Sequence, residues 1–349
     1  MVWFYLLSGL FLGWSLGAND AANIFGTAVG TRMIKFRAAA MVTSVFVIAG
    51  AVVSGAGASD TLGELGAVNA LAGSFTVALA AGGTIAWMTR LKVPVSTSQA
   101  IVGGIIGWNL YCGMPTDLTV LGKIVLTWIA SPVLAALFSF LMFRIAMRVV
   151  MRLKVHLLRQ DAYNRAGLLL VGAFGAYSLG ANNIANVMGV FVPAVSIADI
   201  RLSEGLYFSG AQQLFLLGAL AISAGVFTYS RRVMLTVGND LFKLTPVAAF
   251  VVVLSEALVL FLFASEGLQQ LLIRYGLPSL PLAPVSSSQA VIGGIIGIGL
   301  AKGGQGIRWN ILEKIALGWA ATPVIAGLGS FVALFFMENV FEQPVFRAY

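Results

Sequence analysis

Apolar runs recur along the whole chain, and they constrain its fold more than any other feature of the sequence. A helix that spans a bilayer needs roughly 20 consecutive apolar residues, because the hydrocarbon core is about 30 Å thick. Of the 349 residues, 59% are hydrophobic and only 10% are charged. A soluble domain carries about 25% charged residues. The sequence therefore predicts an all-α polytopic membrane protein.

Ten apolar segments are expected, five in each half of the chain. The first half gives Val2–Thr31, Ala38–Ser54, Ala70–Thr89, Pro94–Cys112 and Ile124–Phe143. The second half gives Ala166–Val192, Leu206–Tyr229, Pro246–Ala264, Pro284–Ala301 and Ile315–Met337. The segments Pro94–Cys112 and Pro284–Ala301 are short. Hairpins that dip into the membrane and return are the alternative to a crossing at these two places.

The basic residues favour one orientation of these segments. If the N-terminus is outside and each segment crosses once, 17 of the 21 Lys and Arg residues fall on the inside. Only Lys123, Arg201, Arg274 and Arg347 fall outside. Cytoplasmic loops are enriched in Lys and Arg, so the N-terminus is expected outside and the basic stretch 144–165 in the cytoplasm. The net charge of +8 then favours contact with anionic lipid of the cell (inner) membrane over a nucleic-acid partner.

Two motifs occur twice, in the same order. Val93–Leu110 matches Ala283–Leu300 at twelve of eighteen positions, and Leu16–Gly26 matches Leu179–Gly189 at seven of eleven. The chain is therefore expected to hold two repeats, 1–143 and 166–337, joined by the linker 144–165 and followed by a tail, 338–349. Five crossings in each repeat is an odd number, so the second repeat enters from the opposite face. Inverted repeats of this kind are common in secondary transporters, with the substrate site at mid-membrane between them.

In each copy of the first motif, three hydroxyl residues follow a Pro-Val pair. Proline suits a helix start, and serine or threonine suits the cap, so helices are expected to begin near Ser96 and Ser286 inside the apolar zone. The first amide N–H groups of a helix lack carbonyl partners and carry partial positive charge, which suits them to an oxyanion. The hydroxyl groups add donors: Ser96, Thr97, Ser98, Ser286, Ser287 and Ser288.

Two such helix ends facing each other would hold a tetrahedral dianion without any arginine. Neither hydroxyl cluster contains Lys or Arg, which suits release as well as capture. The alternative is that these serines only bond back to their own helices. The glycines that follow, such as Gly103 and Gly293, would let neighbouring backbones come close.

The second motif places Asp20 in the middle of the first apolar segment. Asp20 and Glu256 are the two acidic residues well inside the apolar zone, where a charge usually marks an ion path. Gly17 beside two amides predicts a broken helix whose freed carbonyls could bind a cation. Asp20 could bind sodium or a proton, Glu256 is a further candidate, and a purely structural polar cluster is the alternative. Amide oxygens suited to sodium come from Asn19, Asn23, Asn182, Asn183 and Asn186.

These paired motifs resemble those of the inorganic phosphate transporter (PiT) family, over nearly the whole chain. The resemblance implies inverted repeats and transport of phosphate with sodium or protons. It also implies that the repeated motifs form the phosphate and cation sites. On that basis phosphate and cations would bind at Asp20, Asn23, Gln99, Asn186, Gln289 and the six hydroxyl residues. Together with the other amides named above, the expected phosphate ligands are Asn23, Asn186 and the six hydroxyl residues, and the expected cation ligands are Asn19, Asp20, Gln99, Asn182, Asn183 and Gln289, with sodium at Asp20, Asn23 and Asn186. The family's second signature has an acid where this chain has Asn183, which removes one negative charge.

We therefore expect a symporter that imports phosphate, with no cofactor other than the coupling cation. Sulfate or another tetrahedral oxyanion is the alternative substrate. An enzyme is not expected, because the one histidine, His156, lies in the basic linker and no Ser–Lys pair falls at depth. With one cysteine, Cys112, a disulfide framework or a zinc or haem site is also not expected. A channel and a homodimer remain open.

Overall fold

The structure is a computed structural model that describes residues 2–91, 95–153, 156–203, 206–236, 244–304 and 309–347. Pro94, the first residue of the fourth predicted segment, and the basic residues Lys92, Lys154, Lys243 and Arg308, which were predicted on the inside, lie outside the described residues. The described part is mostly helical, as the apolar pattern predicts.

In the described residues, seven helices form the first part of the chain and seven form the second. The first set is α1 (Val2–Asn19), α2 (Ala21–Gly30), α3 (Phe36–Ser54), α4 (Ala56–Leu65), α5 (Leu71–Arg90), α6 (Thr97–Cys112) and α7 (Leu118–Leu153). The second set is α8 (Leu157–Met188), α9 (Gly210–Thr228), α10 (Ser230–Thr236), α11 (Pro246–Leu262), α12 (Glu266–Arg274), α13 (Ser287–Ala301) and α14 (Trp309–Asn339). A 3₁₀ turn, Gly189–Phe191, follows α8, and β1 (Ile200–Ser203) pairs antiparallel with β2 (Leu206–Phe208).

Six described helices are long and apolar enough to cross a membrane: α3, α5, α7, α8, α9 and α14. The pair α11–α12 would give a seventh span but is bent by 68°. The remaining predicted segments are broken or short. The first segment is divided into α1 and α2, and the segments predicted at Pro94–Cys112 and Pro284–Ala301 yield helices of only 16 and 15 residues, α6 and α13. The chain is thus a multi-pass helical membrane protein in which some segments are helical over only part of their length.

The two halves of the chain pack in matching ways, and helices of each half pack against helices of the other. Helix α6 packs against α5 and against α14 from the other half, and α13 packs against α11 and against α7 from the other half. In the same way α1 packs against α5 and α9, and α8 packs against α11 and α3. Each short helix is therefore held by one helix of its own repeat and one long helix of the other.

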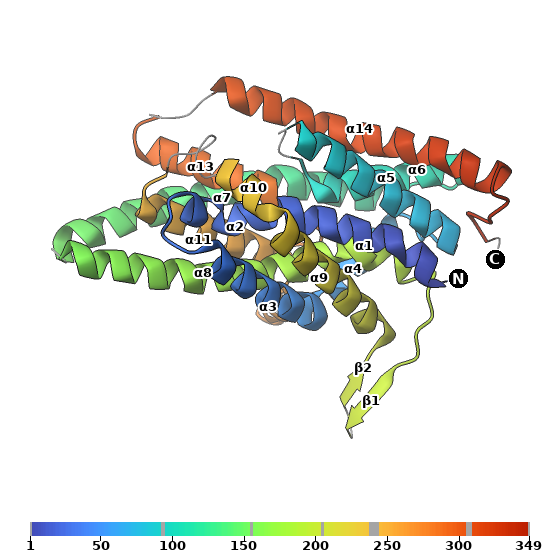
Figure 1. Cartoon of the computed structure of the whole chain (residues 1–349), viewed down its shortest axis with the longest axis horizontal. Coiled ribbons are helices and arrows are strands. Elements are labelled where there is room, and N and C mark those ends of the chain that lie inside the picture. The colour runs from blue at the N-terminus through green and yellow to red at the C-terminus, as the bar shows by residue number, and fades with distance from the viewer. Residues whose placement is uncertain are drawn as a thin grey trace.

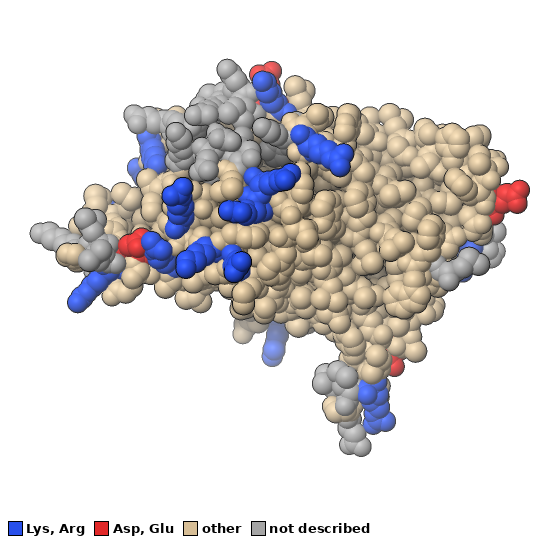
Figure 2. Space-filling view, viewed as in Figure 1, with Lys and Arg blue, Asp and Glu red and all other residues tan. Residues whose placement is uncertain are grey.

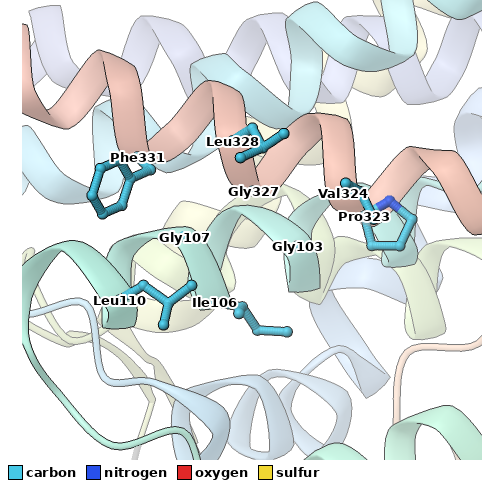
Figure 3. Close-up of a pocket in the computed structure, with 9 residues that line it drawn as sticks. All are labelled: Gly103, Ile106, Gly107, Leu110, Pro323, Val324, Gly327, Leu328 and Phe331. Atoms are coloured by element: carbon cyan, nitrogen blue, oxygen red, sulfur yellow. The ribbon is translucent and has the colours of Figure 1, made fainter.

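Glycine makes the closest of these contacts. A Cβ atom on Gly103 of α6 would lie 2.1 Å from the carbonyl oxygen of Pro323 in α14, and one on Gly293 of α13 would lie 2.1 Å from that of Pro132 in α7. No side chain fits there, as expected where small residues let membrane helices approach. Beside the first contact lies an apolar cavity of about 480 Å³, shown in Figure 3, whose lining contains none of the predicted site residues.

The two short helices point toward opposite ends of the molecule. Figure 1 shows both chain termini at one end and the α7–α8 connection at the other, with α6 toward the first end and α13 toward the second. Most of the predicted linker 144–165 is itself helical, as the ends of α7 and α8. On the face that Figure 2 shows, Lys and Arg gather over the half nearer the α7–α8 connection. This is the charge asymmetry on which the predicted orientation depends.

Candidate functional site

The helices α6 and α13 begin where the hydroxyl clusters predict. Ser96 and Ser286 have extended backbones and act as the caps: the Ser96 hydroxyl accepts from the Gln99 N–H, and the Ser286 hydroxyl accepts from the Gln289 N–H, both at 3.3 Å. Each cap satisfies one of the N–H groups that a helix start leaves without partners. The amides of the two residues that follow each cap keep no intrahelical acceptor and are available to an oxyanion.

The two helix starts are in direct contact. The hydroxyl of Ser288, in the first turn of α13, donates to the carbonyl oxygen of Val95 at 2.9 Å, and Val95 directly precedes the cap of α6. On the α6 side, the hydroxyls of Ser96 and Ser98 lie 3.0 Å apart. The six hydroxyl residues therefore lie around one interior region, and all are buried.

The junction of α1 and α2 lies between these helix starts and contacts both. The Thr97 hydroxyl donates to Asp20 Oδ2 at 3.0 Å, and Asn19 donates to Asp20 Oδ1 at 2.8 Å. The Asn23 side-chain amide donates to the hydroxyl oxygens of Ser287 at 3.0 Å and Ser288 at 3.3 Å. Asp20 thus joins the start of α6, and Asn23 joins the start of α13.

The break in the first helix lies at Asp20, and the prediction that placed it at Gly17 was wrong. Gly17 is inside α1, where a Cβ atom would lie 1.9 Å from the carbonyl oxygen of Ile222 in α9, so this glycine serves packing. Asp20 itself has right-handed helical angles, and its N–H still bonds the Leu16 carbonyl at 2.7 Å. The junction is therefore a mild interruption that leaves few carbonyls free.

The second copy of this motif is not broken, because α8 is continuous from Leu157 to Met188. The side-chain amide of Asn182 bonds the segment that precedes α13. Its nitrogen donates to the Ala283 carbonyl at 3.0 Å, and its oxygen accepts from the Val285 N–H at 2.9 Å. These contacts favour a role in positioning α13. Asn186 donates to Asn183 Oδ1 at 2.9 Å, and the described residues show no hydrogen bond from this pair to a hydroxyl cluster.

Few charged side chains are buried in the described interior, and those that are buried are acidic. Asp20 is 2% exposed and Glu256 is 1% exposed, and they are the only charged side chains among the buried described residues. The predicted amide residues are also buried, except for Asn23, which is half-buried. An anion at this place would therefore be held by neutral donors, and its charge would have to be balanced by cations.

Several buried oxygens at these residues have no partner among the described groups. They are Gln99 Oε1, Gln289 Oε1, Asn186 Oδ1 and both carboxylate oxygens of Glu256. Buried polar atoms in proteins are almost always hydrogen-bonded, so each of these atoms needs an explanation. Oxygen atoms without donors are the ligand type that a hard cation such as sodium takes.

Sequence reasoning did not find the Val95 carbonyl as the acceptor that joins the two helix starts. A backbone carbonyl carries no residue-type signal, and its position follows only once both helices are placed. Asn182 was recognised as a polar residue inside an apolar segment. Its hydrogen bonds to the segment before α13 could not be predicted, because that segment lies about a hundred residues away in the sequence.

Known proteins match this chain over nearly its whole length. The phosphate transporter family matches residues 16–271 and 279–348. A protein of Methanocaldococcus jannaschii that carries the name phosphate permease is 28% identical over 94% of this chain and 95% of its own. The chloroplastic inorganic phosphate transporter 2-1 of Arabidopsis thaliana is 26% identical over 93% of this chain and 70% of its own.

One solved structure shares the fold. It is a sodium-dependent phosphate transporter that is 24% identical, with a TM-score of 0.74, and the match covers 97% of this chain and 99% of that one. The likeness supports the helical architecture. Since the family match covers most of the residues, including both copies of each motif, the chain belongs to the phosphate transporter family.

Proposed function

We propose that this protein imports inorganic phosphate by symport with a cation, sodium or a proton, through alternating access. The observation that carries the proposal is the meeting of two hydroxyl-bearing helix starts in the protein interior, joined by the bond from Ser288 to Val95. Family membership and the names of the relatives support phosphate as the substrate.

Phosphate would bind between the starts of α6 and α13. The free N–H groups after the Ser96 and Ser286 caps and the hydroxyls of Thr97, Ser98, Ser287 and Ser288 are donors that suit phosphate oxygens. Asn23 already donates to Ser287 and Ser288, so its amide is in place to reach the same oxyanion. Asn186 stays in the proposed set through its side-chain N–H groups, one of which donates to Asn183 Oδ1.

The coupling cation would bind at the acidic side of this site. Asp20 supplies the charge, and Asn19, Asn23, Gln99, Asn183, Asn186 and Gln289 supply neutral oxygens. A cation there lowers the cost of bringing a divalent anion into a region of low dielectric constant, because opposite charges attract most strongly where water is excluded. The solved relative named sodium-dependent favours sodium over the proton.

The packing of each short helix against a long helix of the other half gives a route to alternating access. Since α6 and α13 contact matching helices from opposite ends, a state open at one end has a counterpart open at the other. The N-terminus is assigned to the outside and the α7–α8 connection to the cytoplasm of the cell membrane. The gathering of Lys and Arg near that connection supports this assignment.

Uptake by purified protein in liposomes tests the proposal. Labelled phosphate should accumulate when an inward sodium or proton gradient is imposed, and accumulation should stop when the gradient is dissipated. Uptake that ignores both gradients would refute symport. Excess sulfate should compete poorly, and strong competition would favour a general tetrahedral oxyanion as the substrate.

A further inference from the structure

We propose that Glu256 and Asp20 together form a cation site that has no acidic counterpart at the pseudo-equivalent place. Glu256 is a direct ligand there of a coupling alkali cation such as sodium. This inference rests on the proposed function and adds two things to it. It assigns a role to Glu256, and it states that the pseudo-equivalent place, at Ala81 and Asn183, binds no cation through an acid.

Glu256 is the least explained polar group in the described interior. Its side chain is 1% exposed, and neither carboxylate oxygen has a hydrogen-bond partner among the described groups. By contrast, both oxygens of Asp20 accept hydrogen bonds, from Asn19 and Thr97. A buried carboxylate without donors is costly, so its presence points to a ligand that the carboxylate holds.

The packing of α11 places Glu256 at the level of the first turn of α13. The Ala283 N–H donates to the carbonyl of Phe263 at 3.2 Å, so the segment before α13 begins beside the end of α11, and the two helices run antiparallel. Val252 of α11 packs against Gly294 of α13, 3.3 Å from a Cβ built there. Glu256 is four residues after Val252 and therefore lies on the same face, one turn nearer the hydroxyl cluster.

Glu256 lies in the same region as the other acid, although the two residues belong to different halves of the chain. Helix α11 packs against α2, which begins directly after Asp20, and Ala257, next to Glu256, packs with Ile24 of α2 around Gly175 of α8. Two negative groups that share a buried region repel each other, and a cation between them removes that repulsion. Gln289, in the first turn of α13, has a buried oxygen without a partner in the described part and adds a neutral ligand at this level.

The positions that match Glu256 and Asp20 in the other repeat carry no acid. Val77 of α5 packs against Gly104 of α6 as Val252 packs against Gly294, at 3.2 Å. Four residues after Val77 stands Ala81, which is fully buried, where the second repeat has Glu256. Asn183 stands in the motif where the first copy has Asp20. Both acids therefore belong to one of two pseudo-equivalent places, and the other place is neutral.

The test compares Glu256→Gln with two matched controls in the same liposome assay. Ser255→Ala removes a buried hydroxyl that only bonds the Val251 carbonyl of its own helix, and Glu266→Gln removes an exposed charge on α12. Glu256→Gln should weaken the apparent sodium affinity about tenfold, because a full charge at ligand distance is lost. The apparent phosphate affinity at saturating sodium should stay within about twofold. Both controls should behave as the wild type.

A binding measurement in detergent gives a readout without transport. Sodium without phosphate should raise the unfolding temperature of the wild type and of both controls relative to choline, and it should do so much less for Glu256→Gln. If Glu256→Gln does not fold, Glu256→Asp keeps the charge on a shorter side chain and should give a weaker sodium response than the wild type.

Three outcomes separate this inference from the proposed function. Wild-type uptake that needs no cation gradient would refute the symport itself. Cation-coupled wild-type uptake, with an unchanged sodium response in Glu256→Gln, would overturn the role of Glu256 alone and would fit a carboxyl that stays protonated. A loss of phosphate affinity at saturating sodium would also overturn it, because Glu256 would then act on the anion side.

Discussion

The Ser288 hydroxyl, from the second half of the chain, lies 2.9 Å from the Val95 carbonyl oxygen, from the first half. This bond joins the starts of two helices that point toward opposite ends of the protein. It places the positive ends of both helix dipoles next to one another in the interior. Two such ends repel unless an anion or a negative side chain lies between them, and Asp20 lies there in this structure.

Replacement of both caps, Ser96→Ala with Ser286→Ala, should weaken the apparent phosphate affinity about tenfold or more. Each cap is worth about 1 kcal/mol, and both orient the amides that would hold the anion. Ser223→Ala is the control, because that hydroxyl only bonds the Ala219 carbonyl of its own helix. Concentration-dependent uptake in liposomes measures the effect. An unchanged affinity in the double variant would move the phosphate site elsewhere.

Asp20→Asn should abolish cation-coupled uptake and leave the protein folded. The asparagine has the same shape and can still accept from Thr97, so the lost quantity is the charge that balances phosphate entry. Asp60→Asn, an exposed acid in α4, serves as the control. Expression, gel filtration and gradient-driven uptake are measured together. Near-normal uptake by the Asp20 variant would remove this residue from the coupling site.

Gly103→Ala should lower the unfolding temperature by several degrees, because a Cβ atom there would lie 2.1 Å from the Pro323 carbonyl oxygen. Gly83→Ala is the matched control: it meets no atom within 4 Å, and alanine favours the helix. Thermal unfolding in detergent measures both variants. Equal stability of the two would contradict the close contact of α6 and α14.

Trp108→Phe should destabilise the end of α6 by about 1–3 kcal/mol. The Trp108 indole N–H donates to the Val345 carbonyl at 2.9 Å, which ties the C-terminal segment to α6, and both residues are 1% exposed. Phenylalanine leaves that carbonyl buried without a donor. Trp87→Phe, which is exposed on α5, is the control. Faster proteolysis of the C-terminal segment should accompany the loss of stability, and unchanged proteolysis would argue that the tie is unimportant.

The parts of this structure that follow from local chemistry could be predicted from the sequence. Hydroxyl residues after proline cap helices wherever they occur, so the starts of α6 and α13 were predicted correctly from Ser96 and Ser286. The repeat of two motifs predicted a two-fold arrangement, and the apolar runs predicted membrane helices. These features depend on residue type and spacing alone.

The parts that depend on distant contacts could not be predicted. A glycine beside two amides is typical of a helix break, but Gly17 packs against α9. This contact becomes evident only when α9 is placed. Asn182 carries an amide oxygen of the kind that binds cations, but its amide forms two hydrogen bonds with the segment before α13. The difference between Glu256 and its counterpart Ala81 was also hidden, because it requires knowledge of which residues of α5 and α11 are equivalent.

The most direct test of the phosphate site is an experimental structure with arsenate, a tetrahedral phosphate analogue whose arsenic atom gives an anomalous X-ray signal. The account predicts one strong anomalous peak between Thr97–Ser98 of α6 and Ser287–Ser288 of α13, within hydrogen-bond reach of Asn23. A peak only at basic residues on the surface, or none in the interior with the protein in an occluded state, would contradict it.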